Sequence, residues 1–292
     1  MSDTESMPEG ALAGIRVIDL TRILAGPFCT MLLADMGAEV IKVESPGDGD
    51  AIRTQGVIKD GMSWYFAQFN RNKKSVTLDL YTDEGKAKIA ALLESADVLV
   101  ENFRPGVLAK MGFDEARLKQ LNPRLIIGSV NGYGSTGPYV DRPSFDFIAQ
   151  AMSGFMSLTG EIEGEPMRAA PPMADLIAGL YCAFGVVTAL AARYRTGEGQ
   201  YIEASLNNSL ISMMAFLSAE YFATGKPPAR SGNNHAIVAP YGMFKAKNGA
   251  IAVAPSNETY AIRFLDALGL GHLMEDDRFR TNADRMRNRV DL

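Results

Sequence analysis

Cysteine and histidine are both scarce in this chain, with two of each among 292 residues. Cys29 and Cys182 are too few for a disulfide framework, and each lies in an apolar stretch, which predicts reduced thiols packed in a core. His235 and His272 are far apart in sequence, and no group of His and Cys residues has the spacing of a zinc site. The sequence therefore predicts a reducing compartment and no metal centre.

Basic residues do not outnumber acidic ones either, with 29 Lys and Arg against 34 Asp and Glu. The formal net charge is −5, and no basic cluster is longer than Arg71-Asn72-Lys73-Lys74, so a phosphate-backbone partner is not expected. No stretch approaches the run of about 20 apolar residues that a membrane-spanning helix needs. The N-terminal residues 2–10 are acidic and polar, unlike a signal peptide. These absences predict a cytoplasmic protein that binds neither nucleic acid nor a membrane.

A glycine-rich dinucleotide loop is absent as well. The first strand-to-helix turn, residues 21–27, has one glycine and one proline where a G-x-G-x-x-G loop needs three glycines. No glycine-rich loop of the kind that ends in Lys and Ser or Thr occurs either. A nicotinamide-dependent enzyme is therefore disfavoured.

What the sequence does contain is a repeated alternation of short apolar strands and helices. Strand patterns occupy 14–20, 38–44, 73–80, 96–102, 124–133 and 200–206, and helical patterns occupy 28–37, 83–94, 114–121, 144–159, 174–194 and 207–222. Strands this apolar that alternate with helices predict an α/β fold, with a Rossmann-like, doubly wound parallel sheet covered on both faces.

A second, smaller domain follows a segment rich in glycine and proline. We predict a large Rossmann-like domain over residues 1–223, a linker over 224–240 and a small α+β domain over 241–292. The small domain contains two strand patterns within 241–256 and a helical pattern over 260–268. It looks incomplete, because the last residues are helical in character and stop without a C-terminal cap signal.

Asp175 stands directly before an almost wholly apolar helical stretch. In one interpretation its carboxylate caps the helix by accepting backbone N–H bonds, which is common for Asp at such a junction. In the other, the carboxylate is a nucleophile that attacks a carbonyl carbon. The two roles are compatible, and the residue pattern by itself favours the cap.

Seven segments, taken in order, resemble the class III CoA-transferase family, which includes formyl-CoA, carnitine and bile-acid CoA-transferases. They include LTRILAGPFCTMLLADMGAEVIKVESPGDGDAIR and PPMADLIAGLY, and they span 20–53, 69–80, 96–113, 132–155, 171–181, 196–206 and 232–249. The resemblance covers essentially the whole chain. It also indicates that the chain lacks the C-terminal part with which family members usually return to the first domain.

This resemblance implies an enzyme that moves CoA from an acyl-CoA donor to a free carboxylic acid, with Asp175 as the acyl-carrying nucleophile. Coenzyme A is then a thioester substrate, and no tightly bound cofactor is expected. The family assembles as homodimers of interlocked rings, which we expect here too. Because an exposed carboxyl group has a pKa of about 3.9, Asp175 is expected to be ionised at neutral pH without a separate base.

The resemblance also assigns the remaining site residues. Arg104 and Lys110 suit the nucleotide phosphates. The full set of implied CoA contacts is Ala25, Gly26, Asp79, Leu80, Tyr81, Asn102, Phe103, Arg104, Lys110, Ser144, Phe145 and Asp146. Asn233 and His235 are candidates for substrate binding, because residues 233–238 replace the glycine-rich flap of the formyl-CoA enzymes. Leu24 stands where those enzymes have glutamine, which argues against formate or oxalate as the acyl group.

Two other functions stay open. The same fold hosts α-methylacyl-CoA racemases, which remove and return an α-proton with a histidine and an acid. That histidine aligns with Phe145, so racemisation is disfavoured. The other alternative is a non-catalytic or inactive CoA-binding fragment, because family members continue well past Leu292.

Overall fold

The computed structural model describes residues 10–292, so most of the polar N-terminus noted above lies outside the described part of the chain. Two compact units are formed. The first runs to Phe155 and resumes over Ala169–Ser218, and the second comprises Met156–Arg168 and Ala219–Leu292. The C-terminal part of the second unit begins at Ala219, near the predicted boundary between residues 223 and 224. It also takes in residues 156–168, which we had assigned to the large domain.

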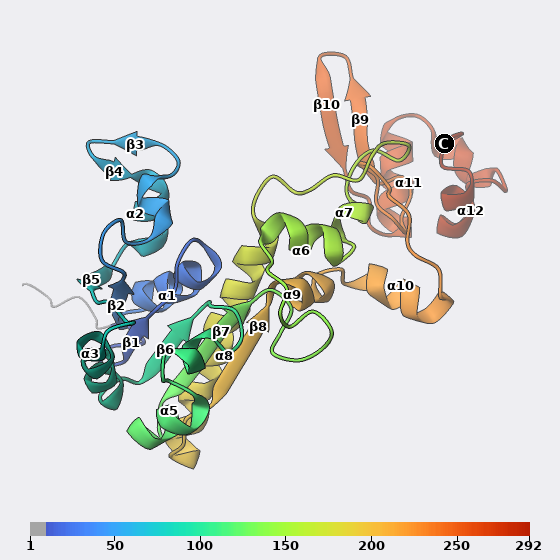
Figure 1. Ribbon diagram of the computed structural model, residues 1–292. Helices are drawn as coiled ribbons and strands as arrows, with labels where there is room; N and C mark the ends of the chain where they lie inside the picture. The colour runs from blue at the N-terminus through green and yellow to red at the C-terminus, as the bar shows by residue number, and fades with distance from the viewer. Residues whose placement is uncertain (1–9) are drawn as a thin grey trace, which may run out of the picture. The chain divides into compact units, whose positions relative to one another are not determined.

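A six-stranded, wholly parallel sheet forms the centre of the first unit (Figure 1). The strand order is β5-β2-β1-β6-β7-β8. The bounds are β1 Arg16–Asp19, β2 Glu39–Glu44, β5 Lys73–Thr77, β6 Val98–Glu101, β7 Ile126–Asn131 and β8 Tyr201–Ser205. This arrangement confirms the predicted doubly wound α/β fold.

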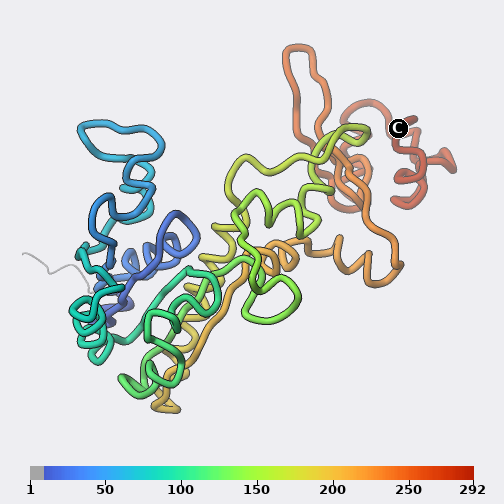
Figure 2. Tube along the Cα trace, viewed as in Figure 1, coloured from blue at the N-terminus to red at the C-terminus, as the bar shows by residue number. Residues whose placement is uncertain are grey.

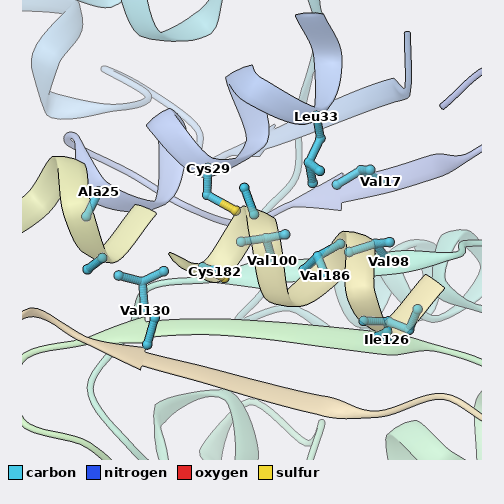
Figure 3. Close-up of a cluster of buried hydrophobic side chains, with 14 of the residues drawn as sticks. Val17, Ala25, Cys29, Leu33, Val98, Val100, Ile126, Val130, Cys182 and Val186 are labelled. Atoms are coloured by element: carbon cyan, nitrogen blue, oxygen red, sulfur yellow. The ribbon is translucent and has the colours of Figure 1, made fainter. Parts of the chain in front are cut away.

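Helices cover both faces of this sheet. Successive strand residues point to opposite faces, so each strand contributes side chains to the apolar cluster on either side. Val17 belongs to the cluster under α1 (Ala25–Asp35) and α8 (Met173–Thr196), shown in Figure 3. Its neighbour Ile18 belongs to the cluster under α3 (Asp83–Glu94) and α5 (Glu115–Leu121). Cys29 and Cys182 lie in the first cluster as free, buried thiols, as predicted (Figure 3).

Helix α8 is the longest helix of the first unit and packs on α1, α9 (Leu206–Ser212), β7 and β8. By length and composition it could cross a membrane, with an 18-residue window of mean hydropathy 1.8. This corrects our expectation that no stretch comes near that length. Half of the window is buried in the fold, however, and a core helix passes the same test, so α8 is weak support for a membrane span.

Figure 2 traces the excursion between β2 and β5, which contains elements that the sequence did not predict. They are the short helix η1 Ala51–Thr54, the hairpin strands β3 Ile58–Lys59 and β4 Met62–Ser63, and the helix α2 Trp64–Asn70. Helix α2 packs on α1 through the rings of Phe28 and Phe69, whose centroids are 6.1 Å apart. A helix of 7 residues is too short to show a clear apolar period, which explains the omission.

Two helices that we predicted as continuous are each broken in two. The first becomes α6 (Asp146–Met152) and α7 (Phe155–Leu158), with Gly154 at φ +86° between them. The second becomes α9 and α10 (Phe216–Thr224), with Ala215 at φ +49° between them. A residue in the left-handed region ends a helix, because it cannot continue the right-handed backbone. The short helix α4 covers Val107–Lys110.

The second unit has a two-stranded antiparallel hairpin followed by helices. Strands β9 and β10 pair as predicted, and Asn257 caps the first helix after them. The elements are β9 Gly242–Ala246, β10 Gly249–Val253, α11 Glu258–Ala267, η2 Gly271–Glu275 and α12 Asn282–Arg287.

Candidate active site

Two neighbouring pockets open at the carboxyl ends of the parallel strands. The first has a volume of about 360 Å³ and is lined by the segments after β1, β6 and β7 and by Asp175. The second has a volume of about 330 Å³ and is lined by the segments after β1, β2 and β5. Arg22, Gly49 and Phe103 line both. Since β1 and β6 are adjacent and lead to helices on opposite faces, the chain diverges there and leaves a crevice.

Asp175 lies in the first turn of α8 and is not its cap. The N-cap residue is Pro172, and it makes no side-chain cap bond. Asp146 of α6 supplies the acceptor instead, because its Oδ1 accepts a hydrogen bond from the Ala174 amide at 2.8 Å. Gln150 donates to the other oxygen of Asp146, also at 2.8 Å. The capping interpretation of Asp175 was therefore wrong, and its carboxylate is left to line the first pocket.

The electrostatic surroundings of Asp175 also differ from our expectation. Burial, and after it the negative charge of Asp146, together raise the pKa of its carboxyl group to about 7. No hydrogen bond from residues 10–292 offsets these effects at Asp175. The carboxyl group is thus incompletely ionised at neutral pH, whereas an exposed acid would be fully ionised. A group poised in this way is suited to act as a nucleophile or a base.

Tyr65 of α2 belongs to the same surroundings, although the sequence did not point to it. Burial, followed by the charges of Asp175 and Asp50, raises the pKa of its hydroxyl group to about 12. Tyr65 therefore keeps its proton at neutral pH, and its ring packs on Phe69 with the centroids 5.7 Å apart.

The sequence matches the family described as CoA-transferase family III over residues 12–292. The chain belongs to this family. It is 42% identical to the succinate–glutarate CoA-transferase of Agrobacterium fabrum, covering 96% of this chain and 72% of the relative. It is 40% identical to the succinyl-CoA:glutarate CoA-transferase of Mus musculus, covering 100% of this chain and 66% of the relative. The prediction of a CoA-transferase is confirmed.

Solved structures of similar chains share the fold of this family III chain. A CAIB/BAIF family protein from Brucella suis has a TM-score of 0.84 and 41% identity, covering 97% of this chain and 76% of that chain. A hypothetical protein from Mycobacterium tuberculosis has a TM-score of 0.87 and 31% identity, covering 98% and 76%. Both match the two units described above over nearly all of this chain.

Most of the CoA contacts implied for this CoA-transferase lie at the two pockets. Ala25, Asn102, Phe103, Arg104, Ser144 and Phe145 line the first, and Asp79, Leu80, Tyr81 and Phe103 line the second. Asn102 also holds the loop after β1, since its side chain donates to the Arg22 carbonyl at 2.8 Å and accepts from the Arg22 amide at 3.0 Å.

The other predicted residues of the family III site lie elsewhere. Gly26 packs against Thr21, where a Cβ would lie 2.4 Å from the Thr21 Cβ. Lys110 is exposed at the end of α4 and lines neither pocket. Asp146 caps α8, as described above. Asn233 and His235 belong to the second unit, where the His235 ring packs on Tyr241 with the centroids 4.6 Å apart.

Sequence reasoning missed several residues that line the first pocket of this CoA-transferase. Arg22 and Arg142 join the predicted Arg104 there, so three arginine residues line the pocket that contains Asp175. Arg22 stacks over Phe103 at 5.6 Å and Arg142 over Tyr139 at 4.3 Å. Both arginines lie in segments that resemble the family, 20–53 and 132–155, but the sequence did not mark them as binding residues. Such a border suits anionic substrates. In the part of the chain that the structure describes, no three His, Cys, Asp or Glu residues are grouped to hold a metal ion.

Proposed function

We propose that this family III enzyme transfers CoA from an acyl-CoA to a dicarboxylic acid through covalent intermediates on Asp175. The observation that carries the proposal is the position of the Asp175 carboxylate, which lines the pocket at the strand ends. Because Asp146 already caps the helix, the Asp175 carboxylate is available to react. Its raised pKa indicates an anion that is poorly stabilised by its surroundings and is therefore disposed to form a bond.

The proposed reaction needs no oxidant and no net proton transfer. A carboxylate oxygen of Asp175 attacks the thioester carbon, the C–S bond breaks, and a mixed anhydride and CoA thiolate form. The thiolate then attacks the Asp175 carbonyl carbon, which releases the donor acid and leaves an aspartyl-CoA thioester. The acceptor carboxylate reverses these two steps, which forms the new acyl-CoA and regenerates the Asp175 carboxylate.

The proposed substrate class rests on the relatives and on the charge of the pocket. The relatives are named as succinate–glutarate, acetyl-CoA:oxalate and succinyl-CoA:mesaconate CoA-transferases. Arg22, Arg104 and Arg142 border the pocket and suit both the CoA phosphates and a second carboxylate on the acid. We therefore propose succinyl-CoA as the donor and a dicarboxylic acid as the acceptor, with Leu24 still arguing against oxalate.

We further propose that the enzyme is a cytoplasmic homodimer without a tightly bound cofactor, and that it binds neither nucleic acid nor a membrane. The net charge of −5 supports the absence of a nucleic-acid partner. The apolar side chains of Phe147, Leu180 and Phe184 are 54%, 49% and 69% exposed, which supports a subunit interface over α6 and α8.

Intact-mass spectrometry tests the covalent step. Wild-type enzyme and the Asp175→Ala variant are mixed with a panel of acyl-CoAs and trapped briefly with hydroxylamine, with Asp146→Asn as the matched control. Hydroxylamine displaces CoA from the activated Asp175 carbonyl carbon, so we expect an aspartyl hydroxamate mapped to Asp175 in the wild type and the control, and none in Asp175→Ala. If CoA binds but no donor leaves an adduct, the covalent proposal is wrong. Solvent deuterium exchange at the α-carbon would then test the racemase alternative.

A further inference from the structure

The loop after β1 contains a residue in an unusual backbone conformation. Ile23 has φ +68°, in the left-handed region that side chains branched at Cβ rarely adopt. Such a conformation persists only where surrounding contacts hold it. Ile23, Leu24 and Ala25 line the pocket that contains Asp175, so the path of the chain at Ile23 sets one wall of the site.

The contact that holds Ile23 comes from a buried ion pair. The Ile23 amide donates to Asp50, with 3.1 Å to Oδ1 and 3.2 Å to Oδ2. Asp50 is paired with Lys42 at 3.0 Å, and both side chains are 1% exposed. Lys42 also donates to the Thr21 carbonyl at 2.7 Å. The pair therefore binds the backbone on both sides of Arg22, which itself lines both pockets.

A second buried pair anchors the same loop from the sheet. Asp19 accepts hydrogen bonds from the Thr21 amide at 2.8 Å and from the Thr30 hydroxyl at 2.7 Å. Lys73 pairs with Asp19 at 3.1 Å and donates to the Pro27 carbonyl at 3.0 Å. Taking charges out of water is costly, so a buried pair is weak support for stability alone. Both pairs instead converge on the wall of the pocket.

We propose that Asp50 is a positioning residue for acyl-CoA binding. Its carboxylate, neutralised by Lys42, keeps Ile23 in the left-handed conformation and so keeps the loop of Arg22–Ala25 in place between the two pockets. Asp50 lines the second pocket but acts on the first through the Ile23 amide. The proposal deepens the proposed function and depends on it for the identity of the ligand.

The proposal makes glycine at position 23 a specific test. Glycine adopts positive φ without penalty. In Ile23→Gly the loop should therefore keep its backbone conformation without the hydrogen bond from the residue 23 amide to Asp50. Because Asp50→Ala alone leaves Lys42 buried and unpaired, the main variant is Lys42→Met/Asp50→Leu, which removes both charges at similar volume. Asp50→Asn, which keeps the shape of the side chain, is the second variant. Asp48→Ala, an exposed acid in the same loop, is the matched control.

The measurements are the Kd for CoA by calorimetry, KM and kcat with succinyl-CoA, and the melting temperature. We expect the charge-free double variant to weaken CoA binding and raise KM by at least about tenfold, with a smaller change in kcat. Because Ile23→Gly also removes a side chain that lines the pocket, the reference is the Ile23→Gly single variant, and adding Ile23→Gly to the double variant should bring binding to within about threefold of that reference. Asp50→Asn should lose less CoA affinity, and adding Ile23→Gly should remove that loss too. Asp48→Ala should bind CoA as the wild type does.

The glycine rescue separates positioning from simple stabilisation. If the ion pair only stabilises the fold, affinity follows the melting temperature and Ile23→Gly lowers both further. That result, or wild-type affinity in the double variant, overturns the proposal. If the double variant does not fold, Asp50→Asn with and without Ile23→Gly provides the same comparison of CoA affinity with melting temperature. Because CoA affinity needs no transfer reaction, an enzyme that binds CoA but transfers it to no acid contradicts only the proposed function.

Discussion

At the scale of single residues, two carboxylates near the start of α8 divide the roles that the sequence had combined in one. Asp146 accepts the amide hydrogen bond of Ala174, and Asp175 lines the pocket with its pKa raised to about 7. The negative charge of Asp146 contributes to that rise, so the capping residue also tunes its neighbour. Both effects depend on α6 lying beside the first turn of α8.

The rate should therefore depend on pH through Asp175. Only the ionised carboxylate attacks, so we expect kcat/KM to rise with pH, to be half-maximal at about pH 7 and to level off above that pH. Asp146→Asn keeps the oxygen that caps Ala174 but removes the like charge, which should move the rise to lower pH. Rate profiles from pH 5 to 9 for the two proteins provide the measurement. A rise centred near pH 4, unchanged in the variant, would contradict the raised pKa.

The same pKa predicts a cost in stability. The pKa of Asp175 is about 7 when folded and about 3.9 when unfolded, so its contribution to stability is greatest at acid pH and is lost as pH rises through 7. Asp175→Asn should raise the free energy of unfolding at pH 8 by up to about 4 kcal/mol. The difference should disappear below about pH 4. Urea unfolding at both pH values tests this, and an unchanged or lower stability at pH 8 would exclude the effect.

At the scale of elements, the site depends on the close crossing of α1 and α8. A Cβ on Gly179 would lie 2.4 Å from the Ala25 carbonyl oxygen, so the two backbones touch at this point. Asp175 is four residues before Gly179 and therefore lies on the same face of α8. The crossing thus brings Asp175 to the start of α1, where Leu24 and Ala25 line the pocket.

Enlarging this contact should separate the two helices. Gly179→Ala places a methyl group against a backbone oxygen that cannot rotate away, so we expect a loss of about 1–3 kcal/mol in stability. CoA binding should weaken by about tenfold because the pocket wall shifts. Gly185→Ala is the matched control, since its methyl group meets only the side chain of Ile202. Denaturation and CoA calorimetry should show a clearly smaller effect there, and equal effects would argue against a special role for the crossing.

At the scale of the whole molecule, the strand order places the pockets and the buried charges together. The crevice lies between β1 and β6, which are followed by helices on opposite faces of the sheet. Asp19 lies on β1 and Lys42 on β2, directly beneath the crevice. In this enzyme the carboxyl ends of the strands therefore provide both the binding space and its support.

The exposed apolar side chains predict the oligomeric state. We expect sedimentation velocity at micromolar concentration to show a species of twice the 31.6 kDa chain mass. Phe184, at 69% exposure, is the most exposed large apolar side chain in the middle of α8, so Phe184→Asp should shift the protein toward monomer. Phe184→Leu keeps the apolar contact and should remain a dimer. A monomeric wild type would refute the homodimer.

The amino-acid sequence by itself determined the family, the parallel α/β sheet and the choice of Asp175, because strand period, apolar composition and ordered motifs are local properties of the chain. Only the tertiary structure decided that Asp146 caps α8, that the pKa of Asp175 is raised, and that Asp50 and Lys42 hold Ile23. These features depend on burial and on contacts between residues distant in sequence. Spacing along a chain does not record such contacts.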